Sequence, residues 1–231
     1  IPMLVMQGAW ISKHQTAAEN DAQIAEVIAL ANKFPKIVAA VNVGNEIFVD
    51  WSWHRVEDVS KVIGYIRQVR AAITQPVTVN DDYNFWNKPH AKLIADEVDF
   101  IGLHAYAFWN NQSSENAAWW TDSIYHDIQR RHPEHAITYS ETGWPTSRIW
   151  NDGSYEGGLI GIASIENQAK FFNWYDQWVD RNQVISLYFE AFDENWKDIA
   201  NPAGSENHFG LINLQSEAKY ALWDLVDKAT F

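Results

Sequence analysis

The sequence predicts an α/β fold of the (β/α)8 TIM barrel type, with about six β/α units present. Short apolar runs alternate along the whole chain with longer segments whose apolar residues recur at helical spacing. The short runs are apolar on both faces, which is typical of a parallel sheet covered by helices. Polar and aromatic residues suited to chemistry follow the strands and never precede them, as at the carboxyl-terminal rim of a barrel.

A doubly wound sheet is the alternative arrangement of these elements. It usually carries a glycine-rich phosphate loop after its first strand, and Gly8, Ala9 and Trp10 do not form one. We expect strands at residues 2–7, 36–43, 76–80, 98–103, 136–140 and 183–191. We expect helices at 17–31, behind a capping box at Thr16 and Glu19, and at 56–73, 88–96, 117–131, 164–180 and 216–229.

A closed barrel has eight strands, so the six expected units leave two to be accounted for. We interpret the chain as strands 3 to 8 of a barrel. We therefore expect a single barrel domain over residues 1–231 in which the two N-terminal β/α units are absent.

Composition restricts the partners. The net charge of −13 argues against nucleic acid and anionic membranes, which need a basic surface. No run approaches the roughly 18 apolar residues of a membrane span. The absence of cysteine excludes disulfides and thiol chemistry, and the histidines show no zinc-ligand spacing, so we expect no metal and no cofactor. Thirteen tryptophans favour a ligand with flat apolar faces, such as a sugar.

Two expected strands end in a glutamate, at Glu46 and at Glu141. Burying an unpaired carboxylate at the tip of an apolar strand is costly. A helix N-cap or a structural ion pair is the alternative role, but Gly143 and Pro145 prevent a helix from beginning directly after Glu141. Two such strand ends predict paired carboxylates that act as acid/base and nucleophile.

The motifs around these glutamates resemble glycoside hydrolase family 17, the β-1,3-glucanase and β-1,3-glucanosyltransferase family of clan A. The resemblance covers essentially the whole chain and rests on four motifs in the family's order: Val-Gly-Asn-Glu at 43–46, Ser-Glu-Thr-Gly-Trp-Pro at 140–145, Phe-Asp-Glu-Asn-Trp-Lys at 192–197 and His-Phe-Gly-Leu at 208–211.

The resemblance implies a role for individual residues. Glu46 is implied as the general acid/base and Glu141 as the nucleophile. Asn45 is implied to bind the sugar 2-hydroxyl, and Tyr106 to steady the nucleophile. The implied cleft lining consists of Trp144, Glu194, Trp196 and Lys197. The clan also implies a non-proline cis peptide bond at Phe189–Glu190 or a neighbouring bond.

A retaining mechanism needs the two carboxyl groups about 5–5.5 Å apart and in different protonation states. We expect Glu46 to be protonated in the resting enzyme. We expect Glu141 to be ionised and to accept a hydrogen bond from Tyr106.

Other polar residues have open interpretations. We expect Asp81 and Asp82 to form a solvated rim rather than a metal pair. His104 either touches substrate, or lies in the core or directly behind the site residues. Glu190 is either a partner of Lys197 or a polar wall of the site. Candidate stacking platforms, with core packing as the alternative, are Trp109, Trp119, Trp120, Trp144, Trp150 and Trp196.

The resemblance thus predicts a metal-free, retaining β-1,3-glucan hydrolase of laminarinase type, monomeric and extracellular or periplasmic. A β-1,3-glucanosyltransferase is the alternative enzyme. A non-catalytic glucan-binding protein is the alternative from another class.

Overall fold

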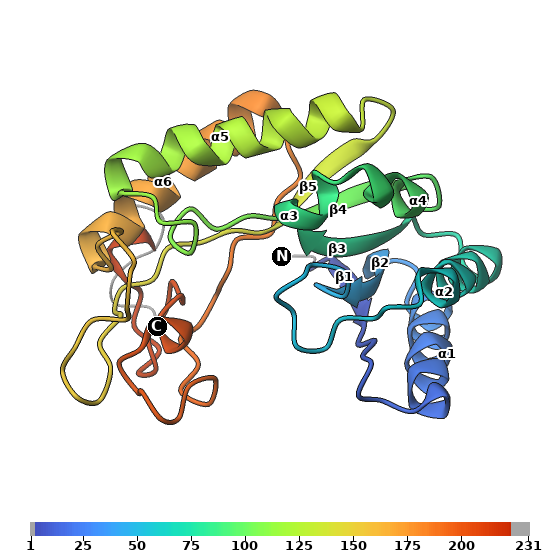
Figure 1. The fold of residues 1–231 in the computed structure, drawn as a ribbon, viewed down its shortest axis with the longest axis horizontal. Helices are drawn as coiled ribbons and strands as arrows, with labels where there is room; N and C mark the ends of the chain where they lie inside the picture. The colour runs from blue at the N-terminus through green and yellow to red at the C-terminus, as the bar shows by residue number, and fades with distance from the viewer. Residues whose placement is uncertain (1–2, 223–231) are drawn as a thin grey trace. The chain divides into compact units, whose positions relative to one another are not determined.

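The computed structural model describes residues 3–222. Its named strands form one sheet in the order β1-β2-β3-β4-β5 (Figure 1). The strands are β1 Val5–Ala9, β2 Val38–Asn45, β3 Val77–Asp82, β4 Phe100–His104 and β5 Ala136–Glu141. The longer helices are α1 Ala17–Lys33, α2 Val59–Ala72, α5 Ser114–Arg131 and α6 Ile165–Asn182. Shorter helical turns are α3 Tyr83–Trp86, η1 Pro89–Ala91, α4 Lys92–Ala95, η2 Ser205–Asn207 and η3 Tyr220–Leu222.

The first four strands pair in parallel, each with its neighbour in sequence. Parallel neighbours need a crossover between them, and helices or helical turns fill these crossovers. The predicted α/β fold class is confirmed. All carboxyl ends of these strands therefore lie at one edge of the sheet, which is where β2 delivers Glu46 and β4 delivers His104.

The chain forms two compact units. The first contains the residues up to His104 together with Tyr125–Thr138, and the second contains Ala105–Ile124 and the chain from Tyr139 onward. Strand β5 begins in the first unit, and its last residues, including Glu141, belong to the second. A single barrel domain over 1–231 stays a prediction.

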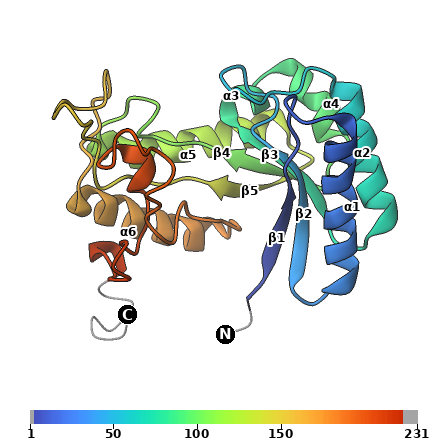
Figure 2. The same cartoon turned by 90° about the horizontal axis from the view of Figure 1, so that it is seen from below.

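In the first unit, α1 and α2 pack against each other and against the strands (Figure 2). The buried residues of α1 are Asn20, Ile24, Val27 and Ala31. Those of α2 are Val62, Tyr65, Ile66 and Val69. In each set every residue has another three or four positions away, which places the set on one helix face. The capping box predicted at Thr16 and Glu19 is present, because each side chain bonds the other's main-chain N–H.

In the second unit, α6 buries an aromatic face made of Phe171, Tyr175 and Trp178. Ser164 caps this helix by accepting the Asn167 N–H. The indole N–H of Trp178 donates to Asp122 of α5 at 2.7 Å, so the polar edge of a buried ring is satisfied.

The strand expected at 183–191 does not form a ladder. One isolated bridge joins Tyr139 to Ser186. Its main-chain bonds run from Tyr139 N–H to the Ile185 carbonyl at 3.1 Å and from Leu187 N–H to the Tyr139 carbonyl at 2.9 Å. Apolar composition predicted a strand here, but a strand also needs successive hydrogen-bonded partners. The cis peptide bond expected at Phe189–Glu190 is present.

Two other expectations change at the ends of the chain. The first strand begins at Val5, and Met3 and Leu4 before it are exposed. The helix expected at 216–229 does not begin at Ser216, whose φ of 64° is left-handed; a short turn forms at Tyr220–Leu222, and residues 223–231 lie outside the described part of the chain. Among the described residues, no helix has both the length and the apolar character needed to cross a bilayer.

Candidate active site

Glu46 follows β2 in a left-handed turn. Gly44 has φ of 98° and Glu46 has φ of 50°. A side chain at position 44 would be strained by this φ, and its Cβ would also lie 2.4 Å from Cδ1 of Ile47. The Glu46 N–H donates to the Asn80 carbonyl of β3 at 2.8 Å. This hydrogen bond holds the main chain of Glu46 against the neighbouring strand β3.

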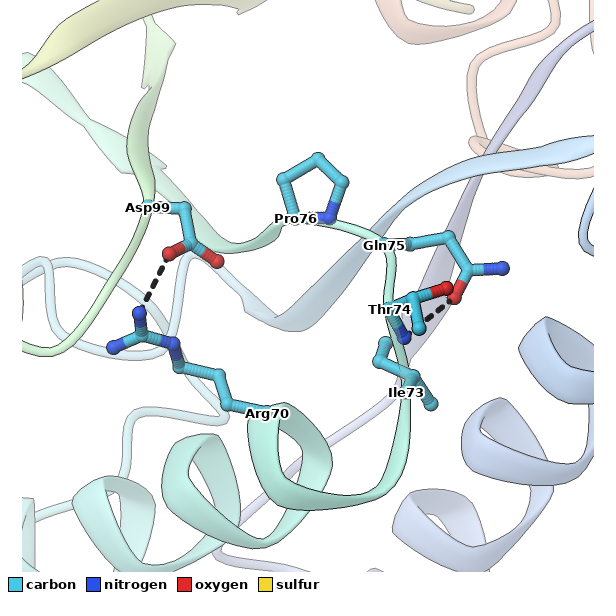
Figure 3. Close-up of a pocket in the computed structure, with 6 residues that line it drawn as sticks. All are labelled: Arg70, Ile73, Thr74, Gln75, Pro76 and Asp99. Atoms are coloured by element: carbon cyan, nitrogen blue, oxygen red, sulfur yellow. Dashed lines mark hydrogen bonds and ion pairs between the residues drawn. The ribbon is translucent and has the colours of Figure 1, made fainter.

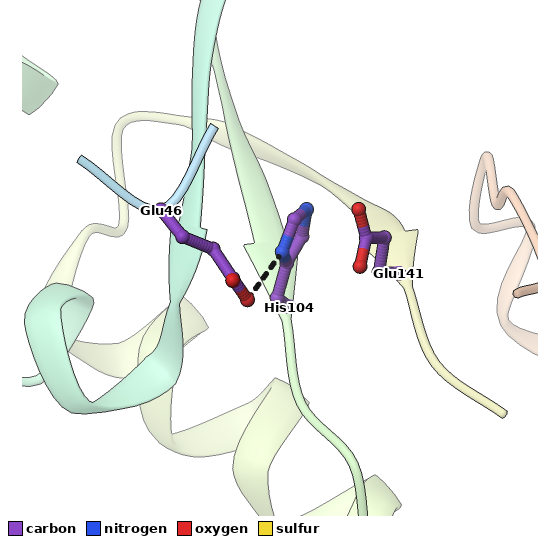
Figure 4. A group of neighbouring side chains, drawn as sticks. All are labelled: Glu46, His104 and Glu141. Atoms are coloured by element: carbon purple, nitrogen blue, oxygen red, sulfur yellow. Dashed lines mark hydrogen bonds and ion pairs between the residues drawn. The ribbon is translucent and has the colours of Figure 1, made fainter. Parts of the chain in front are cut away.

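His104, at the end of β4, is the hydrogen-bond partner of the Glu46 carboxyl group. Its Nδ1 lies 3.0 Å from Oε1 of Glu46 (Figure 4). The imidazole is fully buried, whereas 18% of the Glu46 side chain is exposed. This buried position agrees with the expectation that His104 lies in the core or directly behind the site residues. Since Nδ1 can donate to an ionised carboxylate or accept from a protonated one, this pair can support either protonation state of Glu46.

Asp81 and Asp82, at the end of β3, are buried, so the expected solvated rim is wrong. Asp81 accepts the N–H groups of Phe48 and Asp82, each at 2.8 Å. Asp82 accepts the Asn84 N–H and caps α3. Burial raises the pKa of Asp81 to about 8 and that of Asp82 to about 6. Main-chain donors at the strand end are what allow these carboxyl groups to face inward.

Asn45 is held through its main chain. Nε2 of His54 lies 2.8 Å from the Asn45 carbonyl oxygen, and because a carbonyl only accepts, Nε2 carries the proton. Nδ1 of His54 then faces Oγ of Ser52 at 3.2 Å. The predicted contact between Asn45 and a sugar 2-hydroxyl stays a prediction.

Glu141 is the last residue of β5. The Tyr106 hydroxyl donates to its Oε2 at 2.8 Å, so the hydrogen bond expected from the sequence is present. Tyr106 itself is buried, and its ring meets the edges or faces of Phe189 and Phe209. A rigidly packed hydroxyl that donates to a carboxylate favours the ionised form of that carboxylate.

A cluster of charges follows the cis peptide bond in the second unit. Nζ of Lys197 lies 3.1 Å from Oε2 of Glu190 and 3.0 Å from Oε2 of Glu194. The same ammonium group lies 4.0 Å from the Phe189 ring centroid. Of the two interpretations of Glu190, pairing with Lys197 is correct. Burial raises the pKa of Glu190 to about 7, against the opposing effect of Lys197.

The expected aromatic platforms differ in their exposure to solvent. Trp144 is fully buried between Phe108 and Phe171, and its N–H donates to the Ile162 carbonyl at 3.0 Å. Its expected role in stacking on sugar does not agree with this position, because the ring has no free face. Trp196 is 64% exposed and available to a ligand.

Sequence reasoning missed the exposed indoles of two loops, with Trp10 in one loop and Trp51 and Trp53 in the other. Both loops follow strands of the sheet, with Trp10 directly after β1 and with Trp51 and Trp53 in the loop after Glu46. Their position after a strand was the available signal.

Chemically, Glu46, Glu141 and His104 also carry the atom types that bind metal ions. Glu46 and His104 bond to each other, and Glu141 accepts from Tyr106. The expected absence of a metal stays a prediction.

A hollow of about 440 Å³ lies at the opposite edge of the sheet, lined by Arg70, Ile73, Thr74, Gln75, Pro76 and Asp99 (Figure 3). Its charged groups hold the fold together: Arg70 pairs with Asp99 at 2.7 Å, and Asp99 accepts the Val77 N–H at 2.8 Å. Because barrel chemistry resides at the carboxyl edge, this hollow is not the candidate active site.

Parallel strands that deliver hydrogen-bonded glutamates at their carboxyl ends are the arrangement expected of an α/β glycoside hydrolase. A family model described as the BtgE/BtgC glycoside hydrolase domain matches residues 2–210. The chain belongs to this family.

Similar proteins point the same way. A glucan 1,3-beta-glucosidase of Saccharomyces cerevisiae is 26% identical, over 86% of this chain and 67% of that protein. An endo-laminarinase from Formosa Hel1_33_131 has a similar structure, with a TM-score of 0.85 and 27% identity, over 98% of this chain and 70% of that one. An active-site mutant of the Rhizomucor miehei beta-1,3-glucanosyltransferase, in complex with laminaritriose, gives a TM-score of 0.74 and 25% identity, over 92% and 73%. The chain spans 32% to 67% of the length of four curated relatives that it matches.

Proposed function

We propose that this protein is a retaining β-1,3-glucan hydrolase. Glu46 protonates the leaving oxygen, and Glu141 attacks the anomeric carbon to form a glycosyl-enzyme ester. Glu46 then removes a proton from water, which hydrolyses the ester and restores both carboxyl groups. The mechanism requires the two carboxyl groups to lie about 5–5.5 Å apart across one sugar.

The observation that carries this proposal is the different environment of the two glutamates. Glu141 receives a hydroxyl donor from Tyr106 at 2.8 Å, whereas Glu46 faces an imidazole nitrogen at 3.0 Å that can accept or donate. A fixed donor suits a nucleophile that stays ionised, and a partner of either polarity suits a group that gains and loses a proton.

The substrate follows from the relatives. Proteins named for glucan 1,3-beta-glucosidase, endo-laminarinase and beta-1,3-glucanosyltransferase activity support a β-1,3-glucan. Membership of glycoside hydrolase family 17 in particular rests on the motifs at 43–46 and 140–145. We propose that the protein acts outside the cytoplasm, because a polysaccharide does not cross a membrane. We also propose that it acts as a monomer.

Azide rescue tests the two roles separately. Glu46→Ala and Glu141→Gly are each expected to lose about 10²-fold or more in kcat on laminarin. With an activated aryl β-laminaribioside, azide should give the α-glycosyl azide with Glu141→Gly and the β-glycosyl azide with Glu46→Ala. Glu134→Gln, an exposed carboxyl before β5, is the matched control and should keep wild-type activity. Full activity in both variants would refute the roles of Glu46 and Glu141, whereas laminarin binding without hydrolysis by the unchanged protein would leave a glucan-binding protein.

Glucanosyl transfer is the second candidate, favoured by the structural similarity to the Rhizomucor miehei enzyme. The ester intermediate is the same, and a sugar hydroxyl replaces water. Products at rising laminari-oligosaccharide concentration separate the two: longer chains indicate transfer, and shorter chains alone indicate hydrolysis.

A further inference from the structure

We propose that Trp10 and Trp53 form a stacking site for a glucosyl unit of the β-1,3-glucan, outside the catalytic glutamates. This site rests on the proposed function, since it extends the surface that would hold the same polysaccharide. We call it the indole platform and define it as Trp10 and Trp53 with the two imidazoles that back them, His14 and His54.

The rings of the platform are ordered by mutual stacking. The Trp10 and His54 centroids lie 4.6 Å apart with an interplanar angle of 30°. His14 and Trp53 stack at 5.2 Å and 21°, and Trp53 meets His54 edge-on at 5.1 Å. Although the imidazoles cover part of each indole, 43% of Trp10 and 66% of Trp53 remain exposed.

Hydrogen bonds hold the two loops of the platform together. The Lys13 N–H donates to the His54 carbonyl at 3.2 Å, and Nε2 of His14 contacts the Trp53 carbonyl at 2.9 Å. Helix α1 supports the first loop, because Asn20 exchanges two hydrogen bonds with the Ser12 main chain, both at 3.1 Å. Rings that are already fixed lose little freedom when a ligand binds.

The platform is connected to the proposed acid/base, Glu46, which lies in the same unit. His54 backs Trp10 with its ring and donates from Nε2 to the Asn45 carbonyl, one residue before Glu46. The same imidazole therefore positions a platform indole and the main chain beside the proposed acid/base. A polysaccharide extends beyond the sugar at the cleavage point, and its next units need a surface.

The chemistry of the platform selects a neutral ring with apolar faces. An indole offers a flat apolar face and a polar edge, which suit the C–H face and the hydroxyl edge of a glucosyl ring. Exposed indoles that are ordered rather than packed inward indicate a binding surface. The chain's net charge of −13 fits an uncharged ligand.

Binding in a laminarin-containing native gel tests the platform. The inactive Glu46→Gln protein prevents digestion, and Trp10→Ala and Trp53→Ala are added to it. Each added change is expected to weaken laminarin binding about 5- to 10-fold. Phe34→Ala is the matched control, because Phe34 is an exposed aromatic of the same unit that precedes β2, at the opposite edge of the sheet. In the active protein, the same two changes should raise KM for laminarin with kcat retained.

A second measurement uses the unchanged protein, so it tests the platform even if a variant fails to fold. Laminarin should slow N-bromosuccinimide oxidation of Trp10 and Trp53, located by peptide mass spectrometry, and pullulan should not. Unchanged oxidation under saturating laminarin overturns the proposal, and so does protection that depends on protein concentration alone, which indicates a contact between copies. Platform binding without laminarin cleavage would overturn the proposed function only, whereas cleavage with unaltered binding in the variants would overturn the platform only.

Discussion

Asp81 illustrates how a single carboxyl group is shaped by its position at a strand end. Its oxygens accept the N–H groups of Phe48 and Asp82, and no part of its side chain reaches solvent. Phe48 belongs to the loop that follows Glu46. The Asp81 carboxyl group in β3 therefore holds the loop that follows the neighbouring strand β2. Burial disfavours the charged form more than these donors favour it, and the pKa rises from 3.8 to about 8.

This pKa predicts a pH dependence of stability. Between pH 3.8 and about 8 the folded protein retains a proton on Asp81 that the unfolded chain has lost. The folded state then binds more protons, so the free energy of unfolding falls as pH rises through this window and levels off above it. Asp82 contributes with the same sign up to about pH 6.

The Asp81→Asn variant cannot titrate at this position. Urea unfolding from pH 4 to pH 9 should show a shallower decline for the variant than for the wild type, apart from a constant offset from the lost acceptor. An equally steep decline in the free energy of unfolding of both proteins would contradict a raised pKa of Asp81.

Single residues also show where sequence reasoning succeeded and where it failed. The Tyr106–Glu141 hydrogen bond was predictable from the family resemblance, because Glu141 lies in the motif at 140–145 and Tyr106 closely follows the expected strand at 98–103. The burial of Asp81 and of Trp144 was not, because a residue after a strand can turn toward solvent or toward the core. Packing and local donors decide that direction, and neither is visible in a motif.

At the scale of elements, the segment after β5 depends on a close backbone approach at Gly143. A Cβ built there would lie 2.0 Å from the Phe189 carbonyl oxygen and 3.2 Å from the Phe209 ring. The atom in the way is main chain, so a rotamer change cannot relieve the clash. Glycine at this position lets the Glu141 strand end and the segment with the cis bond pack together within the second unit.

Gly143→Ala should therefore destabilise the protein by about 1–3 kcal/mol, the usual cost of overpacking, and lower activity by displacing Glu141. Urea unfolding and laminarin hydrolysis measure the two effects. Gly157→Ala is the matched control, since nothing lies within 4 Å of its Cβ, and it should change neither. Wild-type stability in Gly143→Ala would refute the close approach.

Helices were easier to predict than strand ladders. The α1 capping box and the α2 periodicity are local patterns that a helix satisfies by itself. A strand is defined by a partner, and the apolar segment at 183–191 finds only one bridge, to Tyr139. Hydrophobicity could indicate that this segment is extended, but not how long its ladder would be.

At the scale of the whole molecule, a charge of −13 and a neutral substrate predict weak salt dependence. Ion pairs between the enzyme and the glucan are not expected, so screening by salt should weaken few of the contacts that bind the glucan. KM for laminarin should change less than about twofold between 50 and 500 mM NaCl. A steep rise in KM with salt would indicate a charged ligand in place of a neutral glucan.

The sequence by itself determined the alternation of strands and helices and the positions of Glu46 and Glu141 at strand ends, because periodicity and motifs are properties of neighbouring residues. Only the tertiary structure decided that His104 faces Glu46, that Asp81 and Trp144 are buried, and that Trp10 and Trp53 stand exposed against imidazoles. These outcomes depend on contacts between segments that are distant along the chain, and the free energy of such contacts is set by packing and hydrogen-bond geometry.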